Sequence, residues 1–133
     1  MYLLDTNVII DIIRGKYPAL KQHFLNTRPS DIKIPSIVLA ELEFGAQNSD
    51  DYNKNKLRFS SITNAFSIQT FAEKESVCYG KIRKYLSSIG NLIGPNDMLI
   101  AATALANDAI IVTHNIDEFS RVPNLVIEDW TLY

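Results

Sequence analysis

Short apolar runs with no polar alternation recur along this chain between segments of helical character. Residues 2–4, 32–34 and 110–112 are such runs, and uniform apolarity is typical of parallel strands that are buried on both faces. Helix-starting side chains follow two of these runs, at Asp5 and Ser36. Strands and helices that alternate along one short chain predict an α/β sandwich with a mostly parallel sheet.

Breakers and caps divide the rest of the chain into elements. Gly15 and the pair Gly90 and Asn91 end helices, whereas Pro35 ends a strand and Ser36 caps the helix that follows. The predicted helices cover 8–13, 18–26, 37–47, 52–65, 71–88 and 97–106, and the predicted strands cover 2–4, 32–34, 66–69, 110–112 and 125–127. Because sheets of this kind gather ligands outside the carboxyl ends of their strands, we expect the functional site at that edge.

The composition indicates one domain that covers residues 1–133. A chain of 133 residues with 47% hydrophobic residues can bury a substantial core. The 13 Lys and Arg residues against 15 Asp and Glu give a net charge of −2, so any contact with nucleic acid must be local. The single cysteine, Cys78, excludes an internal disulfide and is interpreted as a packed residue in a reducing compartment. No secretory or membrane-spanning segment is visible, which predicts a soluble cytoplasmic protein.

Acidic residues stand where these elements begin, end or turn a face inward. Asp5 directly follows the first strand, and Asp97 lies in the first turn of a helix whose inner face is apolar. Glu41 shares a helical face with apolar residues such as Val38 and Phe44, where a carboxylate needs a partner. Taken alone, a helix N-cap would explain Asp5 and the helix dipole would explain Asp97 equally well.

A fourth acid comes from the pair Asp117 and Glu118, which follows the strand ending at Thr113. Carboxylates gathered at one edge repel one another by roughly 4 kcal/mol per close pair at about 4 Å and an effective dielectric near 20, so a cation is the usual compensation. Oxygen ligands suit Mg²⁺ or Mn²⁺, and the chain has no Cys or His cluster with zinc spacing. The joint placement of the acids predicts a divalent metal site. The isolated histidines, His23 and His114, are left outside it.

Four stretches of the chain, in order, resemble the motifs of PIN-domain ribonucleases. They are residues 4–10 (LDTNVII), 36–46 (SIVLAELEFGA), 93–102 (IGPNDMLIAA) and 112–123 (VTHNIDEFSRVP). With residues 79–83 (YGKIR) and 128–130 (EDW), the match is distributed over nearly the whole chain and resembles in particular the VapC toxins of type II VapBC toxin–antitoxin pairs. The resemblance implies a single PIN domain, a three-layer α/β/α sandwich. The chain departs from the family pattern at Asn124 and at residues 91–92, away from the acids.

The resemblance also assigns roles to individual side chains. The catalytic and metal-binding acids are Asp5, Glu41, Asp97 and Glu118. Glu118 is the fourth because it immediately precedes Phe119, and Asp117 is then a neighbour whose assistance stays open. The polar residues that match positions used to orient the acids are Thr6, Thr113 and Asn115.

The chemistry expected of such a site is metal-assisted hydrolysis without a side-chain nucleophile. One or two bound Mg²⁺ ions would polarise the phosphodiester and acidify the attacking water, which leaves 5′-phosphate and 3′-hydroxyl ends. The resemblance implies an RNA substrate, notably the anticodon loop of initiator tRNA, and proteins read RNA sequence mostly in such loops. The candidate cations that would steer RNA to the acids are Lys81, Arg83 and Lys84, or Lys54, Lys56 and Arg58, although each cluster is also typical of a solvated helix face.

Partners and rival functions follow from the same resemblance. It implies a VapB-type antitoxin whose carboxyl-terminal segment wraps the toxin and brings a basic side chain toward Asp5 and Asp97, and a homodimer within that complex. Three alternatives stay open: a PIN nuclease of RNA maturation, an inactive RNA-binding or assembly module, and a Mg²⁺-binding receiver-like module. A receiver needs a phospho-acceptor Asp at the end of its middle strand, and the predicted strand 66–69 ends in none.

Overall fold

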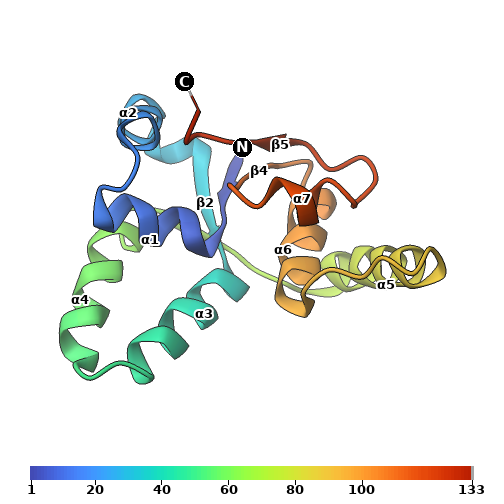
Figure 1. Ribbon diagram of the computed structural model, residues 1–133, viewed down its shortest axis with the longest axis horizontal. Coiled ribbons are helices and arrows are strands. Elements are labelled where there is room, and N and C mark those ends of the chain that lie inside the picture. Colours follow the sequence, from blue (N-terminus) through green and yellow to red (C-terminus); the bar gives the residue numbers. More distant parts are fainter. Residues whose placement is uncertain (133) are drawn as a thin grey trace.

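A five-stranded sheet with helices on both faces forms the described part of the protein, residues 1–132, in the computed structural model (Figure 1). The strands are β1 (Tyr2–Leu4), β2 (Ile32–Pro35), β3 (Ser67–Gln69), β4 (Ile110–Val112) and β5 (Ile127–Glu128). Their order is β3-β2-β1-β4-β5, and each of these pairings is parallel. The predicted three-layer α/β/α sandwich is confirmed, and only Tyr133 of the predicted domain lies outside the described residues.

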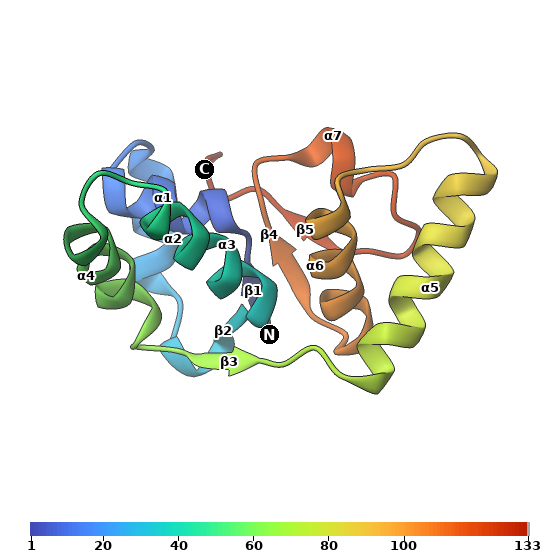
Figure 2. The ribbon, with the colours of Figure 1, turned by 90° about the horizontal axis from the view of Figure 1, so that it is seen from below.

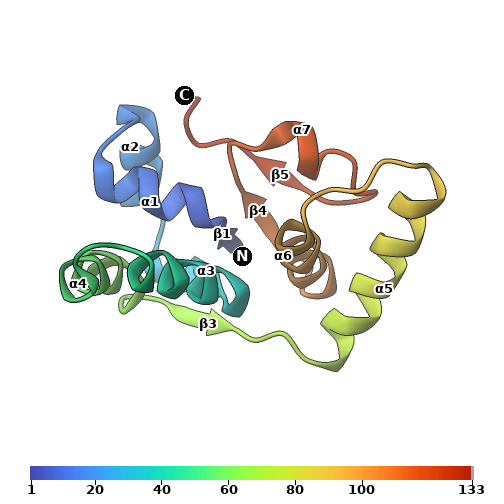
Figure 3. The same cartoon turned by 60° about the horizontal axis from the view of Figure 1, so that its bottom comes forward.

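Helices make most of the connections between the strands. They are α1 (Thr6–Arg14), α2 (Pro18–Asn26), α3 (Ser36–Gln47), α4 (Tyr52–Thr63), α5 (Glu73–Ser88), α6 (Pro95–Ala106) and α7 (Ile116–Phe119), with a 3-10 turn at Pro29–Asp31. α4 and α5 lie at opposite ends of the molecule, and α5 packs along α6 (Figure 2). In Figure 3, α1, α3 and α6 surround β1. Three helices that carry predicted site residues therefore meet around the central strand.

The register of β1 and β4 brings distant parts of the chain to one edge of the sheet. Leu4 at the end of β1 is in register with Val112 at the end of β4. The next residues, Asp5 and Thr113, therefore leave the sheet side by side, and the Asp5 N–H donates to the Val112 carbonyl (3.0 Å). The chain runs from β1 to β2 and β3 on one side and returns to β4 and β5 on the other. This reversal of strand order is where α/β sheets bind ligands.

The apolar runs are buried as the sequence predicts. The fully buried residues include Leu3, Leu4, Ile34, Ile111 and Val112 in the strands and Ile100, Ala101 and Ala104 on α6. Removing a side chain such as Leu or Ile from water contributes about 1.5–3 kcal/mol. The core therefore lies between the three central strands and the inner face of α6, next to the sheet edge where the strands end.

Ser36 does not have the capping role predicted for it. The N-cap of α3 is Pro35, which is also the last residue of β2 and cannot cap with its side chain. The Ser36 hydroxyl instead donates to the Gln69 carbonyl (3.2 Å), across to the end of β3. The other predicted helix and strand ends differ from the structure by about two residues, which is common where helices fray.

The segment after β4 differs most from the prediction. Helix α7 was not predicted, because four residues are too few to show a helical period. The last strand was predicted at 125–127, but its pairing with β4 begins at Ile127, and Leu125 packs against the core before the strand. The unpredicted helix matters for the site because α7 carries Glu118.

A buried carboxylate helps to hold α5 on α6. Glu75 is 1% exposed, and it accepts the Ala72 N–H (2.8 Å) and the Asn107 side-chain amide (2.9 Å). Burial raises the pKa of the Glu75 carboxyl, but these hydrogen bonds outweigh that effect and the pKa is lowered. The contact stabilises the carboxyl-terminal end of α6, the helix that begins near Asp97.

Two expectations from composition can also be compared with the structure. Cys78 on α5 is partly buried and packs against the core, as predicted. Among residues 1–132, none of the helices combines the length and the apolarity that crossing a bilayer requires.

Phe119 fastens α7 to the core, and its truncation tests how firmly that helix is held. The ring is fully buried, whereas Ile116 on the same helix is 39% exposed. We expect Phe119→Ala to lower the free energy of unfolding by about 3–5 kcal/mol, measured by urea denaturation. The control Ile116→Ala should cost about 0.5 kcal/mol or less. Equal losses in the two variants would show that α7 is not anchored through Phe119.

Candidate active site

Asp5 lies at the end of β1 and caps α1. Its Oδ1 accepts the Thr6 N–H (2.8 Å), and its Oδ2 accepts the hydroxyl of Thr113 at the end of β4 (2.9 Å). Only 5% of Asp5 is exposed. Burial raises the pKa of its carboxyl, the two hydrogen bonds oppose this, and the charges of Glu41 and Glu118 add to it. The N-cap considered from the sequence is therefore real, and the same carboxylate lies within reach of the charge of other acids.

Glu41 reaches the site from α3. The Thr6 hydroxyl donates to Glu41 Oε1 (2.7 Å), which links α3 to the first turn of α1. The apolar face predicted around Glu41 is only partly correct, because Val38 is buried whereas Phe44 is 68% exposed. Glu41 itself is half-buried. The hydrogen bond with Thr6, rather than burial on an apolar stripe, explains its placement.

Asp97 and Glu118 come from α6 and α7 and lie next to each other. The Asn115 side-chain amide donates to Glu118 Oε2 (3.2 Å) and more weakly to Asp97 Oδ2 (3.5 Å). A Cβ at Gly94 would lie 3.4 Å from Asp97 Oδ2 and 3.9 Å from Glu118 Oε2. An open pocket of about 260 Å³ is lined by Gly94, Asp97 and Glu41 together with residues 95–96. The lack of a side chain at Gly94 thus leaves space beside the two carboxylates.

The pKa values of the Asp97 and Glu118 carboxyls are shifted in opposite directions. Burial, the hydrogen bond with Glu118 and the negative charges of the other acids raise the pKa of Asp97 to about 8. The hydrogen bonds from Asp97 and Asn115 lower the pKa of Glu118 against the effect of burial, and the charge of Arg121 lowers it further. These shifts favour a protonated Asp97 beside an ionised Glu118 at neutral pH. A cation could take the place of that proton.

The three polar residues that the resemblance placed around the acids join them into one network. Each of Thr6, Thr113 and Asn115 donates to at least one acid, and the fully buried Thr113 hydroxyl also accepts the Asn115 N–H (3.0 Å). The network runs without a break from Glu41 through Thr6, Asp5, Thr113 and Asn115 to Asp97 and Glu118. The structure therefore brings all the predicted site residues together.

Two residues near the acids are placed differently from the expectation. Asp117 is exposed, and within residues 1–132 only its backbone carbonyl, not its carboxylate, forms a hydrogen bond. His114 is not isolated, because its Nδ1 lies 2.9 Å from Asp129 Oδ2 and 3.1 Å from the Thr131 hydroxyl. Its ring also lies against Tyr17, with 5.6 Å between centroids. These contacts tie the carboxyl-terminal segment to the loop after β4.

The donor chemistry of the network fits a hard divalent cation. All four candidate ligands are carboxylates. Within the described part of the chain, no set of three or more His, Cys, Asp or Glu side chains is arranged to hold a metal ion by itself. Mg²⁺ is commonly held by one or two carboxylates while waters and substrate phosphates complete its coordination. Asp97 together with a second carboxylate of the network meets that requirement.

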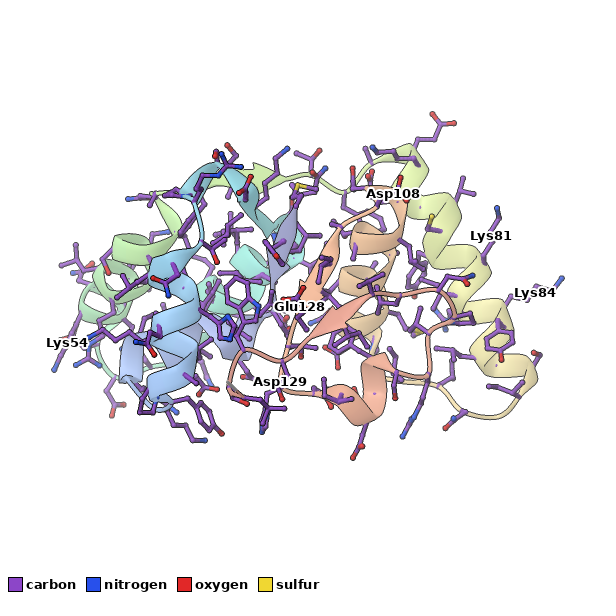
Figure 4. All side chains as sticks on the ribbon, turned by 90° about the horizontal axis from the view of Figure 1, so that it is seen from above. Lys54, Lys81, Lys84, Asp108, Glu128 and Asp129 are labelled. Carbon is purple, nitrogen blue, oxygen red and sulfur yellow. The ribbon has the colours of Figure 1, made fainter. Side chains whose placement is uncertain are left out.

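The lysines predicted to steer RNA lie far apart. Figure 4 shows Lys54 at one end of the molecule and Lys81 and Lys84 at the other, with β1 and β4 between them. Lys56 is paired with Glu43 (2.8 Å). Lys54, Lys81 and Lys84 therefore lie away from the centre of the sheet edge. Arg58, which was predicted together with Lys54, lines a pocket that also contains Glu41.

Arg121, one helical turn after Glu118, is the cation that the sequence analysis missed. Its N–H donates to the Glu118 carbonyl (3.1 Å), and its guanidinium donates to the Leu92 carbonyl (3.2 Å). It lies within residues 112–123, the fourth stretch that resembles the family, but no role was assigned to it, because the helical turn that carries it was not predicted.

Comparison with known proteins agrees with this arrangement. Residues 2–125 match the PIN domain family. The chain is 39% identical over 132 residues to the ribonuclease VapC2 of Rickettsia felis, covering 98% of each chain. It is 33% identical to the tRNA(fMet)-specific endonuclease VapC of Salmonella typhimurium, covering 97% of each. In the crystal structure of VapBC2 from Rickettsia felis bound to a DNA fragment from their promoter, one chain superimposes with a TM-score of 0.88 at 36% identity, covering 97% of this chain and 98% of that one.

The chain therefore belongs to the PIN-domain family and, within it, to the VapC ribonucleases. The receiver alternative is wrong on topology as well. Receivers order their strands 2-1-3-4-5, whereas the order here is β3-β2-β1-β4-β5.

Asp97→Asn tests the stability cost of crowding these acids in metal-free protein. The Asp97 pKa of about 8 in the folded state lies above its ordinary 3.8, so between these values the folded chain binds the extra proton and stability falls as pH rises. The stability of Asp97→Asn should not decrease in this way. Its free energy of unfolding in EDTA, minus that of wild type, should therefore increase from about pH 5 to pH 8. The gain stays below the one-proton limit of about 1.4 kcal/mol per pH unit, because the carboxyl is half-exposed.

The exposed neighbour Asp117 supplies the matched control, and Asp117→Asn should show no such gain. A loss of stability in Asp97→Asn at every pH would instead make Asp97 a structural cap of α6.

Proposed function

We propose that this protein is a Mg²⁺-dependent endoribonuclease and the toxin of a toxin–antitoxin pair, with Mn²⁺ as an alternative cofactor. The observation that carries the proposal is the unbroken hydrogen-bonded network that joins four carboxylates at the ends of β1 and β4. Relatives that align over nearly the whole chain are named ribonucleases or endonucleases. The shared fold and the acid cluster at the sheet edge of this chain support the same chemistry.

The side chains of this protein would supply ligands, orientation and negative charge. Asp5 and Asp97 are assigned as direct ligands, and Glu41 and Glu118 complete the pocket. A bound Mg²⁺ would polarise the phosphodiester and acidify the attacking water. Asp97 would give up its proton when the cation binds, since both cannot occupy the carboxylate.

The nucleophile is water rather than a side chain. The hydroxyls of Thr6 and Thr113 are the two closest to the acids, and both are already used as donors to Glu41 and Asp5. The thiol of Cys78 lies on α5, outside the network. Attack by water at phosphorus, with the 3′ oxygen as leaving group, yields 5′-phosphate and 3′-hydroxyl ends.

The anticodon loop of initiator tRNA is the substrate that we propose. Relatives from Salmonella typhimurium and Shigella flexneri, 33% and 32% identical to this chain, are named tRNA(fMet)-specific endonucleases. A loop also suits an open pocket on the protein surface, because its bases and phosphates can be splayed out of a helix.

A groove next to the acids suits the antitoxin. It has a volume of about 250 Å³ between α1, α3 and α4, and it is lined by Ile10, Ile13, Arg14, Glu41, Leu42, Gly45, Ala46, Asn55, Arg58 and Phe59. An apolar segment of a VapB-type antitoxin could lie along it, and a basic side chain of that segment would meet Glu41 at the acid end. The structural neighbours from Rickettsia felis and Salmonella typhimurium are VapBC complexes, which supports such a partner.

We also propose that the complex contains two copies of this chain. Apolar side chains on α5 and the loop after it are half exposed, namely Val77, Tyr85, Ile89 and Leu92. Side chains of this kind on one element are typical of an interaction surface.

The first test is cleavage of bacterial tRNA by purified, antitoxin-free protein with Mg²⁺ or Mn²⁺, with the ends and sites mapped by sequencing. Asp5→Ala should reduce the rate by about 100-fold or more, because it removes a ligand together with two links of the network. Asp117→Asn, at an acid outside the network, should cut at the wild-type rate. EDTA should stop cleavage by both active proteins.

Other outcomes would select a different function. Folded protein that cuts no RNA with either metal would favour the inactive RNA-binding or assembly module. Cleavage of a precursor RNA without toxicity in cells would favour a nuclease of RNA maturation. Cleavage that survives in Asp5→Ala would contradict the site itself.

The groove can be tested with a glycine that has room for a side chain. A Cβ at Gly45 would meet no heavy atom within 4 Å, and the same is true of Gly80 on α5. Gly45→Phe should therefore fill the groove without unfolding the protein and weaken inhibition of the nuclease by its antitoxin by about tenfold or more. Gly80→Phe, the matched control, should leave inhibition unchanged. Equal inhibition of both variants would place the antitoxin elsewhere.

A further inference from the structure

We propose that Arg121 binds an RNA phosphate adjacent to the scissile one and so brings the substrate to the acids. This inference rests on the proposed ribonuclease function and names a substrate contact of the same site. It concerns a residue outside the acid network and outside the two lysine clusters predicted from the sequence.

The backbone places Arg121 on the same turn as Glu118. The Arg121 N–H donates to the Glu118 carbonyl (3.1 Å), and residues three apart on a helical turn project their side chains from neighbouring positions. The guanidinium Nη1 donates to the Leu92 carbonyl (3.2 Å), two residues before Gly94. Gly94 itself adjoins the oxygens of Asp97 and Glu118. At about 3.8 Å per Cα step, Leu92 and Gly94 are separated by at most roughly 8 Å of chain.

Most of the donors of Arg121 are free for a ligand. A guanidinium has five N–H groups, and the bond to Leu92 uses one of them. Within residues 1–132, no carboxylate forms an ion pair with Arg121, whereas Arg28 is paired with Asp31 and Lys56 with Glu43. Arg121 is also only partly exposed, so its position is restrained. Arg121 is thus a positionally restrained cation, and no carboxylate among the described residues pairs with its guanidinium.

The acid cluster creates the need for such a cation. Four carboxylates at one edge repel the phosphates of RNA, and the net charge of −2 provides no compensating field. The planar fork of arginine matches the paired oxygens of a phosphate. Successive phosphates of a single strand are separated by several ångströms, so a cation beside the acids would hold the neighbouring phosphate while the scissile one lies among the carboxylates. The influence of Arg121 on the pKa of Glu118 agrees with this proximity.

Arg121 could instead serve only to tie α7 to the loop before α6. The substitution Arg121→Gln separates the two roles, because glutamine keeps an N–H donor for the Leu92 carbonyl and removes the charge. A structural tie predicts lower stability and lower kcat with the same dependence on salt. A phosphate contact predicts a higher KM, an unchanged kcat and a weaker dependence on salt.

The experiment measures cleavage of an RNA stem–loop that carries the anticodon loop of bacterial initiator tRNA, at several KCl concentrations and fixed Mg²⁺. Arg121→Gln should raise KM about tenfold, the loss of one charge-assisted contact. The slope of log(kcat/KM) against log[KCl] should become less negative by about 0.7, the value for one phosphate of a single strand. Arg121→Lys, which keeps the charge without the fork, should restore the slope and only part of KM.

The control is Arg28→Gln, which removes the same unit of charge at the 3-10 turn before β2, at the opposite edge of the sheet. It should change neither KM nor the slope. The same shift in both variants, or an unchanged slope in Arg121→Gln, would overturn the proposal. Binding of the same RNA by Asp97→Asn and by Asp97→Asn/Arg121→Gln, followed by fluorescence anisotropy, gives a second readout without chemistry. RNA bound but not cut by wild type would contradict the nuclease alone, whereas equal binding by the two proteins would contradict the role of Arg121.

Discussion

The hydrogen bond from Thr113 to Asp5 is the contact on which the site is built. It joins the ends of two strands that are neighbours in space and 108 positions apart in sequence. The register of β1 and β4 sets its geometry, and full burial of Thr113 shields it from water. A buried carboxylate left without such a donor would be destabilising by about 1–3 kcal/mol. The same two residues also position their neighbours, since Asp5 caps α1 and Thr113 accepts the Asn115 N–H.

Burial and electrostatic repulsion among the clustered carboxylates determine the protonation of the site. Crowding and partial burial raise the pKa of Asp97 to about 8, which favours its protonated form near neutral pH, whereas the pKa of the neighbouring Glu118 is lowered. A proton and a divalent cation would compete for the same oxygens, and this competition links the proposed cofactor to the arrangement of the acids. Arg121 places a positive charge near Glu118, where we propose that it holds a phosphate of the substrate. The crowded acids, a proton that a cation could displace and the restrained arginine are the features on which the proposed phosphodiester site rests.

Much of the fold could be read from the sequence because burial and caps act locally. Uniform apolar runs predicted β1, β2 and β4, and breakers predicted the ends of α2 and α5. Each of these signals depends only on residues within or next to the element. Asp5 and Asp97 could be placed for the same reason, because Asp5 is the N-cap of α1 and Asp97 lies in the first turn of α6. The partners of Glu41 could not, because its hydrogen bond depends on how α3 meets α1. Helix α7 and the role of Arg121 escaped prediction, and β5 was predicted to begin two residues too early, because these positions depend on pairing with β4 and on the burial of Phe119 rather than on a sequence period.

The direct test of the central claim is to count the protons released when Mg²⁺ binds. Metal-free protein in weakly buffered solution near pH 7 is titrated with MgCl₂ while pH and heat are followed. If the cation displaces the proton held by Asp97 and Glu118, wild type should release close to one proton per bound site, and Asp97→Asn should release none. Binding of Mg²⁺ without proton release, or no binding at all, would contradict the account of a protonated carboxylate pair that gives way to a metal.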